Sequence, residues 1–97
     1  MEIDRRLMPR YTVGLRIVVG GMEGATRDIG VNGVSFVVPR ALPVSQPISF
    51  SITLDGEPAR LRLDCAGTVK RCERSSGGQF EVVATIERLD LQPLGGS

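Results

Sequence analysis

The sequence contains no histidine and no tryptophan, and its only cysteines are Cys65 and Cys72. Two thiolates without an imidazole make an unusual zinc site, so a structural metal centre is not expected. Ser75 and Ser76 have no histidine that could act as their general base, and no paired-carboxylate or metal-ligand pattern is present. We therefore expect neither an enzyme nor a resident cofactor.

Aromatic residues and net charge are also scarce. The chain has one tyrosine, three phenylalanines and a formal net charge of +1. A barrel that binds single-stranded nucleic acid needs aromatic stacking platforms on a basic face, whereas these phenylalanines fall at positions expected to face the core. A nucleic acid polymer is therefore not expected as a partner.

Long apolar segments are missing as well. No run of about 18 apolar residues that could span a membrane occurs, and the N-terminus carries acids and arginines with no apolar stretch behind them. This pattern predicts a cytoplasmic protein without membrane insertion, with both cysteines reduced and partly buried. At 97 residues the chain is long enough for one core but not for a second domain.

Positive charge is concentrated near the start of the chain. Residues 5–16 contain four arginines and no acid, and three of these arginines lie in the segment Arg5-Arg6-Leu7-Met8-Pro9-Arg10. The guanidinium fork binds phosphate oxygens bidentately and stacks on flat rings, so this segment suits a phosphorylated ligand that carries bases. The alternative is a solvated basic terminus, which is common at chain ends.

A second feature, Asp28-Ile29-Gly30-Val31-Asn32-Gly33, begins with a carboxylate and ends with a glycine. The carboxylate can accept hydrogen bonds from a purine edge, and glycine lets the backbone approach a ligand closely. In the alternative interpretation Asp28 caps its own backbone. Asn32-Gly33 is also a common hairpin dipeptide, in which Gly33 is expected to have a positive φ.

Alternation of apolar and polar residues predicts a chain made of strands, with no helical period over ten residues. The strands are expected at residues 11–19, 34–38, 48–54, 59–65, 68–72 and 80–86. Gly20 to Gly24 and Ser75 to Gly78 are expected to be turns. Six such strands close into an antiparallel barrel or a compact sandwich. Residues 89–97 contain Pro93 and are expected to form a frayed tail with at most one helical turn.

The order of these features resembles the PilZ domain family, over roughly residues 4 to 88. Arg6 and Arg10 match the Arg-x-x-x-Arg motif of the family, with Arg5 as a basic neighbour. The Asp28–Gly33 turn matches the motif Asp/Asn-x-Ser-x-x-Gly at its first and last positions. Gly30 stands where the family usually has serine.

A third segment, Gly67-Thr68-Val69-Lys70-Arg71, is similar to a Gly-x-Val-x-Arg strand that is common in these domains. Lys70, Arg71 and Arg74 form a second basic group, and one of them is a further candidate for contact with a ligand. The resemblance implies an all-β, six-stranded antiparallel PilZ-like barrel at residues 11–88. It also implies a flexible ligand-binding segment at residues 1–10 and a short C-terminal tail at residues 89–97.

PilZ domains are bacterial receptors for the second messenger cyclic di-GMP, so the resemblance implies this ligand. Arg6 and Arg10 would hold its phosphates and guanines, with Arg5 assisting. Asp28 would accept hydrogen bonds from guanine N1–H and N2–H₂ or orient an arginine, and Gly33 would permit the turn and the approach of the ligand. Binding would order residues 1–10 and so signal to a protein partner or a fused output domain.

Gly30 is the point of departure from the family. The missing serine hydroxyl costs about 0.5–1.5 kcal/mol, whereas a charge-assisted arginine–phosphate contact is worth about 1.5–3 kcal/mol. Glycine also leaves its backbone N–H available to the ligand. We therefore expect weakened rather than abolished binding. The alternative is a PilZ-like barrel that does not bind cyclic di-GMP and acts as a protein-interaction adaptor.

Overall fold

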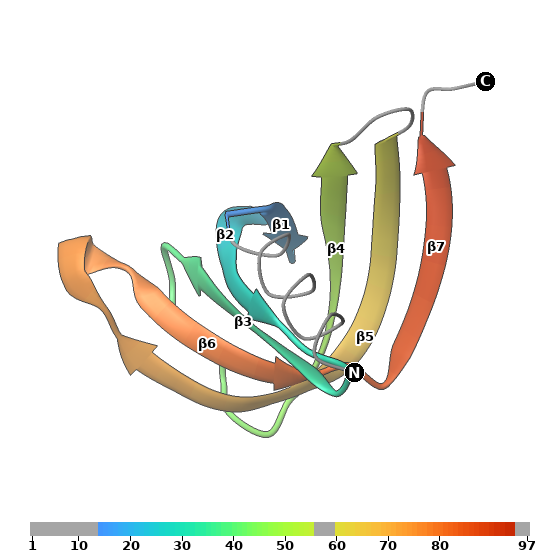
Figure 1. Cartoon of the computed structure of the whole chain (residues 1–97). Helices are drawn as coiled ribbons and strands as arrows, with labels where there is room; N and C mark the ends of the chain where they lie inside the picture. The colour runs from blue at the N-terminus through green and yellow to red at the C-terminus, as the bar shows by residue number, and fades with distance from the viewer. Residues whose placement is uncertain (1–13, 56–59, 95–97) are drawn as a thin grey trace, which may run out of the picture.

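A computed structural model describes residues 14–55 and 60–94, which form seven antiparallel strands and one short 3₁₀ turn (Figure 1). The elements are β1 (Arg16–Val19), β2 (Met22–Ile29), β3 (Gly33–Val38), β4 (Pro47–Asp55), β5 (Arg60–Arg74), η1 (Ser76–Gly78), β6 (Phe80–Thr85) and β7 (Arg88–Leu94). The predicted arginine segment at residues 1–10 lies outside the described residues.

Six of the strands close into a barrel. The strand order is β4-β1-β2-β3-β6-β5-β7, and an additional β4–β5 pairing joins the ends of the six-stranded part. Among the described strands β7 pairs only with β5, and it lies outside the ring. The predicted six-stranded antiparallel barrel is therefore confirmed, and the sandwich alternative is wrong.

The alternating apolar residues fill the inside of this barrel. Successive side chains of a strand point to opposite faces, so each strand gives every second residue to the core. Phe36 of β3 and Phe50 of β4 lie across the interior with ring centroids 6.2 Å apart. The buried apolar side chains are Ile17, Val19, Val34, Phe36, Val38, Phe50, Ile52, Cys65, Val69, Val82 and Ala84.

β2 is a strand that the apolar pattern did not predict. Its sequence, MEGATRDI, buries one polar side chain, Thr26, whose hydroxyl accepts the Leu15 N–H at 3.0 Å. Only Gly20 and Gly21, with φ of 56° and 80°, form the predicted glycine-rich turn. Gly24 already belongs to β2, where a Cβ atom would lie 2.1 Å from the carbonyl oxygen of Val37.

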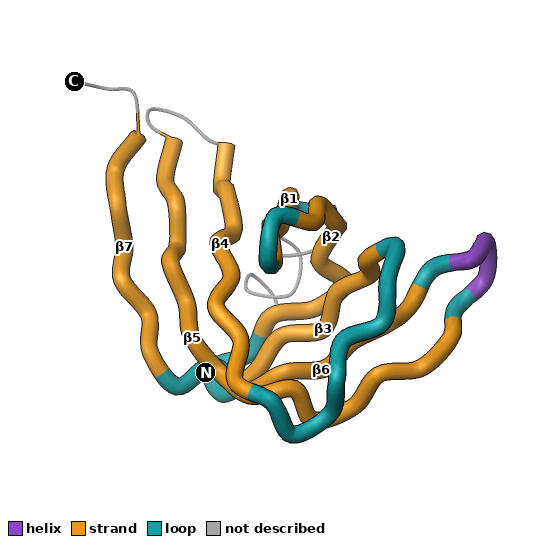
Figure 2. The backbone as a smooth tube through the Cα atoms, turned by 180° about the vertical axis from the view of Figure 1, so that it is seen from behind, coloured by secondary structure: helices purple, strands orange, loops and turns teal. Residues whose placement is uncertain are grey.

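The predictions for the last third of the chain need two corrections. The segments expected at 59–65 and 68–72 are one strand, β5, which pairs with β4 up to Thr68 and with β6 from Val69. The expected tail is a strand as far as Leu94, because residues 88–94 pair with residues 66–60 of β5. Figure 2 shows β4, the first part of β5 and β7 rising together away from the curved β3 and β6.

Candidate functional site

The three described residues of the predicted site line one groove on the outer surface of the barrel. Asp28 lies near the end of β2, Gly30 lies in the turn that follows, and Gly33 is the first residue of β3. The groove has a volume of about 360 Å³, within the range of roughly 300–1,000 Å³ that is typical of small-ligand clefts. The residues that line it are Asp28, Gly30, Gly33, Val34, Ser35, Arg71, Glu81 and Val83. Arg5, Arg6 and Arg10 lie outside the described residues.

The strand register explains why Asp28 and Arg71 share this groove although they are far apart in sequence. Asp28 pairs with Ser35 of β3, Ser35 pairs with Val83 of β6, and Val83 pairs with Arg71 of β5. Directly opposed residues of antiparallel strands point to the same face. Because the alternate residues Val34, Phe36 and Val82 are buried, this row faces outward.

A β-bulge sets the orientation of Asp28. The pairing between β2 and β3 shifts between Thr26 and Asp28, so that Arg27 is the extra residue. Arg27 and Asp28 are consequently both exposed, whereas Thr26 is buried. Bulges re-aim side chains in this way and are frequent next to binding sites.

The turn between β2 and β3 differs from the predicted hairpin. Gly33 does not have a positive φ, and neither does Asn32, so this part of the prediction is wrong. Gly33 is needed for close packing instead, since a Cβ atom there would lie 2.9 Å from the carbonyl oxygen of Ala84. The carbonyl of Asn32 accepts the Ile86 N–H at 2.9 Å, which ties the turn to the end of β6.

The role expected for the backbone of Gly30 also needs correction. Its N–H donates to the carbonyl oxygen of Gly33 at 2.7 Å and is therefore already used within the turn. The Cα of Gly30 faces open space, because the nearest atom to an added Cβ would be the Gly33 carbonyl oxygen at 3.8 Å. The turn would thus accommodate the serine that the family usually has.

The described part of the groove carries both signs of charge. Asp28 and Glu81 each contribute a carboxylate, and Arg71 contributes the one guanidinium among the described lining residues. The Nε of Arg71 lies 3.7 Å from Oε2 of Glu73, and both side chains are exposed, so this ion pair is weak. Arg71 is consequently free to turn toward an anionic or guanine-bearing ligand at little cost.

Arg71, Ser35 and Glu81 are groove residues that the predicted site did not include. Arg71 belongs to the basic group noted in the sequence, but neither Lys70 nor Arg74 lines the groove. A bulge between Val69 and Arg71 explains why Arg71 lines the groove and Lys70 does not, since it places Arg71 opposite Val83. Knowledge of this register, in addition to the alternation within β5, is needed to select Arg71.

The cysteines and the acidic residues offer no metal site within residues 14–55 and 60–94. Cys65 and Cys72 are both free thiols, and no group of three or more Asp, Glu, Cys or His side chains is arranged to hold a metal ion there. The same part of the chain contains no helix that is long and apolar enough to cross a membrane.

Comparison with known protein families gives one matching family. The PilZ domain matches residues 4–94, which include the arginine segment, the groove and β7. Searches among curated proteins and among solved structures gave no significant match.

Proposed function

Because the chain belongs to the PilZ domain family, we propose that it is a receptor for cyclic di-GMP that signals by a change in its N-terminal segment. The observation that carries this proposal is the convergence of Asp28, Gly30, Gly33 and Arg71 on one outer groove. Two family motifs, separated by more than thirty residues in the chain, thereby supply the walls of a single cleft.

The chemistry of the groove suits a guanine base. The carboxylate of Asp28 can accept hydrogen bonds from guanine N1–H and N2–H₂, which are the donors that distinguish guanine from adenine at this edge. Arg71 can donate two hydrogen bonds to guanine O6 and N7, or grip a phosphate. We assign base recognition mainly to Asp28 and a charge-assisted contact to Arg71.

The groove needs additional positive charge to hold a ligand with two phosphates. Its described walls contain two carboxylates, Asp28 and Glu81, and one guanidinium, so their formal charge is negative. Arg5, Arg6 and Arg10 would supply the missing cations. This requirement explains why we propose that the arginine segment closes over the ligand rather than acting as a separate site.

The connection of the arginine segment to the barrel is compatible with this role. The N–H of Gly14 donates to the carbonyl oxygen of Thr26 at 2.7 Å, and β1 runs antiparallel to β2. Gly14 is therefore joined to β2 two residues from Asp28, which is about 7 Å along the strand. Arg10 is four residues from Gly14, so its Cα lies at most about 14 Å away, within reach of the groove.

A ligand-dependent position of residues 1–10 would change the surface available to a protein partner or a fused output domain. The free thiols of Cys65 and Cys72 are compatible with a reducing cytoplasm. We propose that the protein acts in that compartment. Gly30 favours a second candidate function, an adaptor that does not bind the nucleotide, because the family's serine hydroxyl is missing.

Calorimetric titration of cyclic di-GMP into the full chain tests the proposal. We expect saturable binding that is lost in Arg6→Ala/Arg10→Ala and strongly weakened in Asp28→Asn. Arg74→Ala is the matched control, since it removes an exposed arginine that does not line the groove. If the wild-type protein shows neither heat of binding nor thermal stabilisation at millimolar ligand, the receptor function is wrong and the adaptor function stands.

A further inference from the structure

β7 is the edge strand of the sheet formed by residues 14–55 and 60–94. The other strands close on one another in the barrel, whereas β7 pairs only with β5 within the described residues. Leu89 and Leu91 of β7 are 51% and 57% exposed, although they belong to the face whose counterparts on β5, Cys65 and Leu63, are buried or half-buried. An exposed edge with apolar side chains is a template for pairing with another strand.

The opposite face of β7 carries two charges, Arg88 and Asp90, that have no counter-charge among the described residues. Asp90 pairs directly with Asp64 of β5, and like charges in this position repel each other. Arg62 compensates Asp64, with its Nε 3.0 Å from Oδ1 of Asp64. Among the described residues, neither Asp90 nor Arg88 has an ion pair or a side-chain hydrogen bond.

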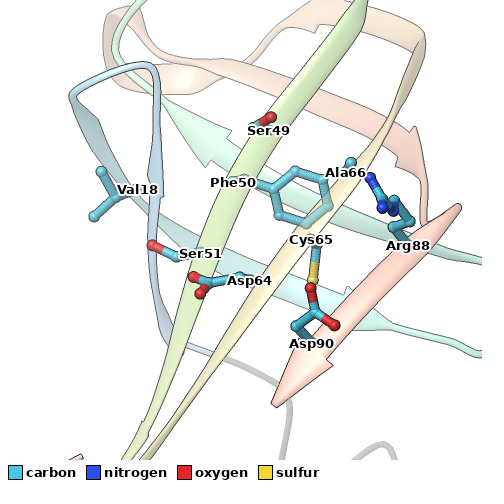
Figure 3. A pocket seen from close by; sticks show the side chains of 9 residues that line it. All are labelled: Val18, Ser49, Phe50, Ser51, Asp64, Cys65, Ala66, Arg88 and Asp90. Atoms are coloured by element: carbon cyan, nitrogen blue, oxygen red, sulfur yellow. The ribbon is translucent and has the colours of Figure 1, made fainter. Parts of the chain in front are cut away.

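These charges border a second groove, of about 420 Å³, on the outer face of β1, β4, β5 and β7 (Figure 3). Its walls include Ser49 and Ser51 of β4 together with Asp64, Arg88 and Asp90. Arg88 and Asp90 are two residues apart and therefore lie on the same face of the edge strand. A partner strand that presents the same two charges in reverse order would neutralise both.

A second copy of this chain presents that strand, and we propose that two copies pair antiparallel through β7 with Leu89 at the two-fold axis. In this register Arg88 lies opposite the partner's Asp90, and Asp90 lies opposite the partner's Arg88. Leu89 packs against the partner's Leu89 on the other face. Asp90, repelled by Asp64 within its own chain, thus gains a counter-charge on its other side.

The neighbouring symmetric registers are less favourable. Centring the pair on Asp90 places two carboxylates opposite each other. Centring it on Leu91 places Leu89 opposite the partner's Pro93, which has no N–H to donate to the ladder. The register centred on Leu89 avoids both problems. It also brings the groove beside Arg88 and Asp90 of one copy next to the same groove of the other copy.

The expected association is weak, because the paired segment is short and its ion pairs are exposed. We expect a monomer–dimer equilibrium with a Kd on the order of 100 µM. Sedimentation velocity of the full chain from about 10 µM to about 1 mM measures it. A wild-type protein that stays monomeric over this range overturns the proposal.

Reversing the charge of Arg88 or of Asp90 tests the proposed register of the two β7 strands. Arg88→Asp puts two carboxylates opposite each other in each half of the dimer, and Asp90→Arg puts two guanidiniums there. Each variant alone should be at least tenfold weaker in self-association than the wild-type protein. An equimolar mixture of the two should form a heterodimer, and the double variant Arg88→Asp/Asp90→Arg should dimerise like the wild-type protein.

Arg40→Asp is the matched control, since it reverses an exposed arginine outside β7. It should leave the dimer unchanged. Asp90→Arg places a cation opposite Asp64, so the monomer should stay folded, which thermal melting checks. A dimer that resists both single reversals, or a failure of the mixture to associate when both variants are folded, overturns pairing through β7.

Discussion

Gly67 and Thr85 lie in direct backbone contact where β5 passes from β4 to β6. A Cβ atom on Gly67 would lie 1.7 Å from the carbonyl oxygen of Thr85. The N–H of the next residue, Thr68, donates to the Thr85 hydroxyl at 2.9 Å. This close approach lets β6 and β7 follow one another along the same edge of β5, so glycine is required here for space rather than for its φ angle.

Gly67→Ala should destabilise the fold strongly, because the clash involves two backbone segments that belong to the barrel wall. Overpacking of this kind costs about 1–3 kcal/mol or more, and each kcal/mol lowers the melting temperature of a domain of this size by about 4–8 °C. Gly30→Ala is the matched control, since its Cβ would make only an ordinary contact at 3.8 Å. Thermal unfolding that is equal in the two variants would contradict this role of Gly67.

The same junction controls the titration of Glu87. The Thr85 hydroxyl donates to Glu87 Oε2 at 2.8 Å and the Thr68 hydroxyl donates to it at 2.9 Å, and these bonds lower the pKa of Glu87 below its ordinary value of 4.5. The stabilisation that they give is present above pH 4.5 and is lost as the pH falls through the pKa of the folded state. Thr85→Val should raise the pKa of Glu87 toward 4.5 in an NMR titration, and an unchanged pKa of Glu87 in this variant would contradict the role of the Thr85 hydroxyl.

Burial and two carboxylates suppress the reactivity of Cys65. Desolvation is the main cause, and the charges of Asp64 and Asp90 add to it, raising the pKa of this thiol from 9.0 to about 11. The unfolded chain therefore loses this proton at lower pH than the folded chain, so the free energy of unfolding should fall as the pH rises from about 9 to 11. In the folded protein iodoacetamide at pH 8 should leave Cys65 unmodified, and mass spectrometry should find it alkylated only after denaturation.

The apolar alternation was sufficient to predict a small β-barrel and most of its core. It missed β2 because Thr26 is the one fully buried side chain of that strand, and its large apolar residues, Met22 and Ile29, lie at its two ends and are only half-buried. It missed β7 because Leu89 and Leu91 are half-exposed on an edge strand that contains a proline. A local pattern cannot reveal a strand whose existence depends on the free edge of β5.

A local pattern also identifies only some of the residues that line the candidate groove. Asp28 and the two glycines are close in sequence, so a short motif could identify them. Arg71 reaches the same groove through the pairings of β2, β3, β6 and β5, including two bulges. Such a relationship is fixed only when the barrel closes.

Arg71→Ala should weaken binding of cyclic di-GMP while leaving the fold intact, because the side chain is exposed and its ion pair with Glu73 spans 3.7 Å. Loss of a charge-assisted hydrogen bond of about 1.5–3 kcal/mol corresponds to a roughly ten- to hundredfold increase in Kd. Calorimetric titration measures the Kd of Arg71→Ala and of the control Arg74→Ala, which changes an arginine of the same strand. Equal affinities of the two variants would show that Arg71 does not contact the ligand.

Gly30→Ser restores the residue that the family usually has and should strengthen binding. The backbone of Gly30 does not have a positive φ, and an added Cβ would meet nothing closer than 3.8 Å, so the turn accepts serine without strain. The Gly30 N–H is already bound to the Gly33 carbonyl, which leaves a hydroxyl as the new donor at this position. One neutral hydrogen bond of about 0.5–1.5 kcal/mol should lower the Kd by up to about tenfold. Gly30→Ala, which adds the Cβ without the hydroxyl, should bind like the wild-type protein; if serine and alanine have the same effect, the hydroxyl makes no contact with the ligand.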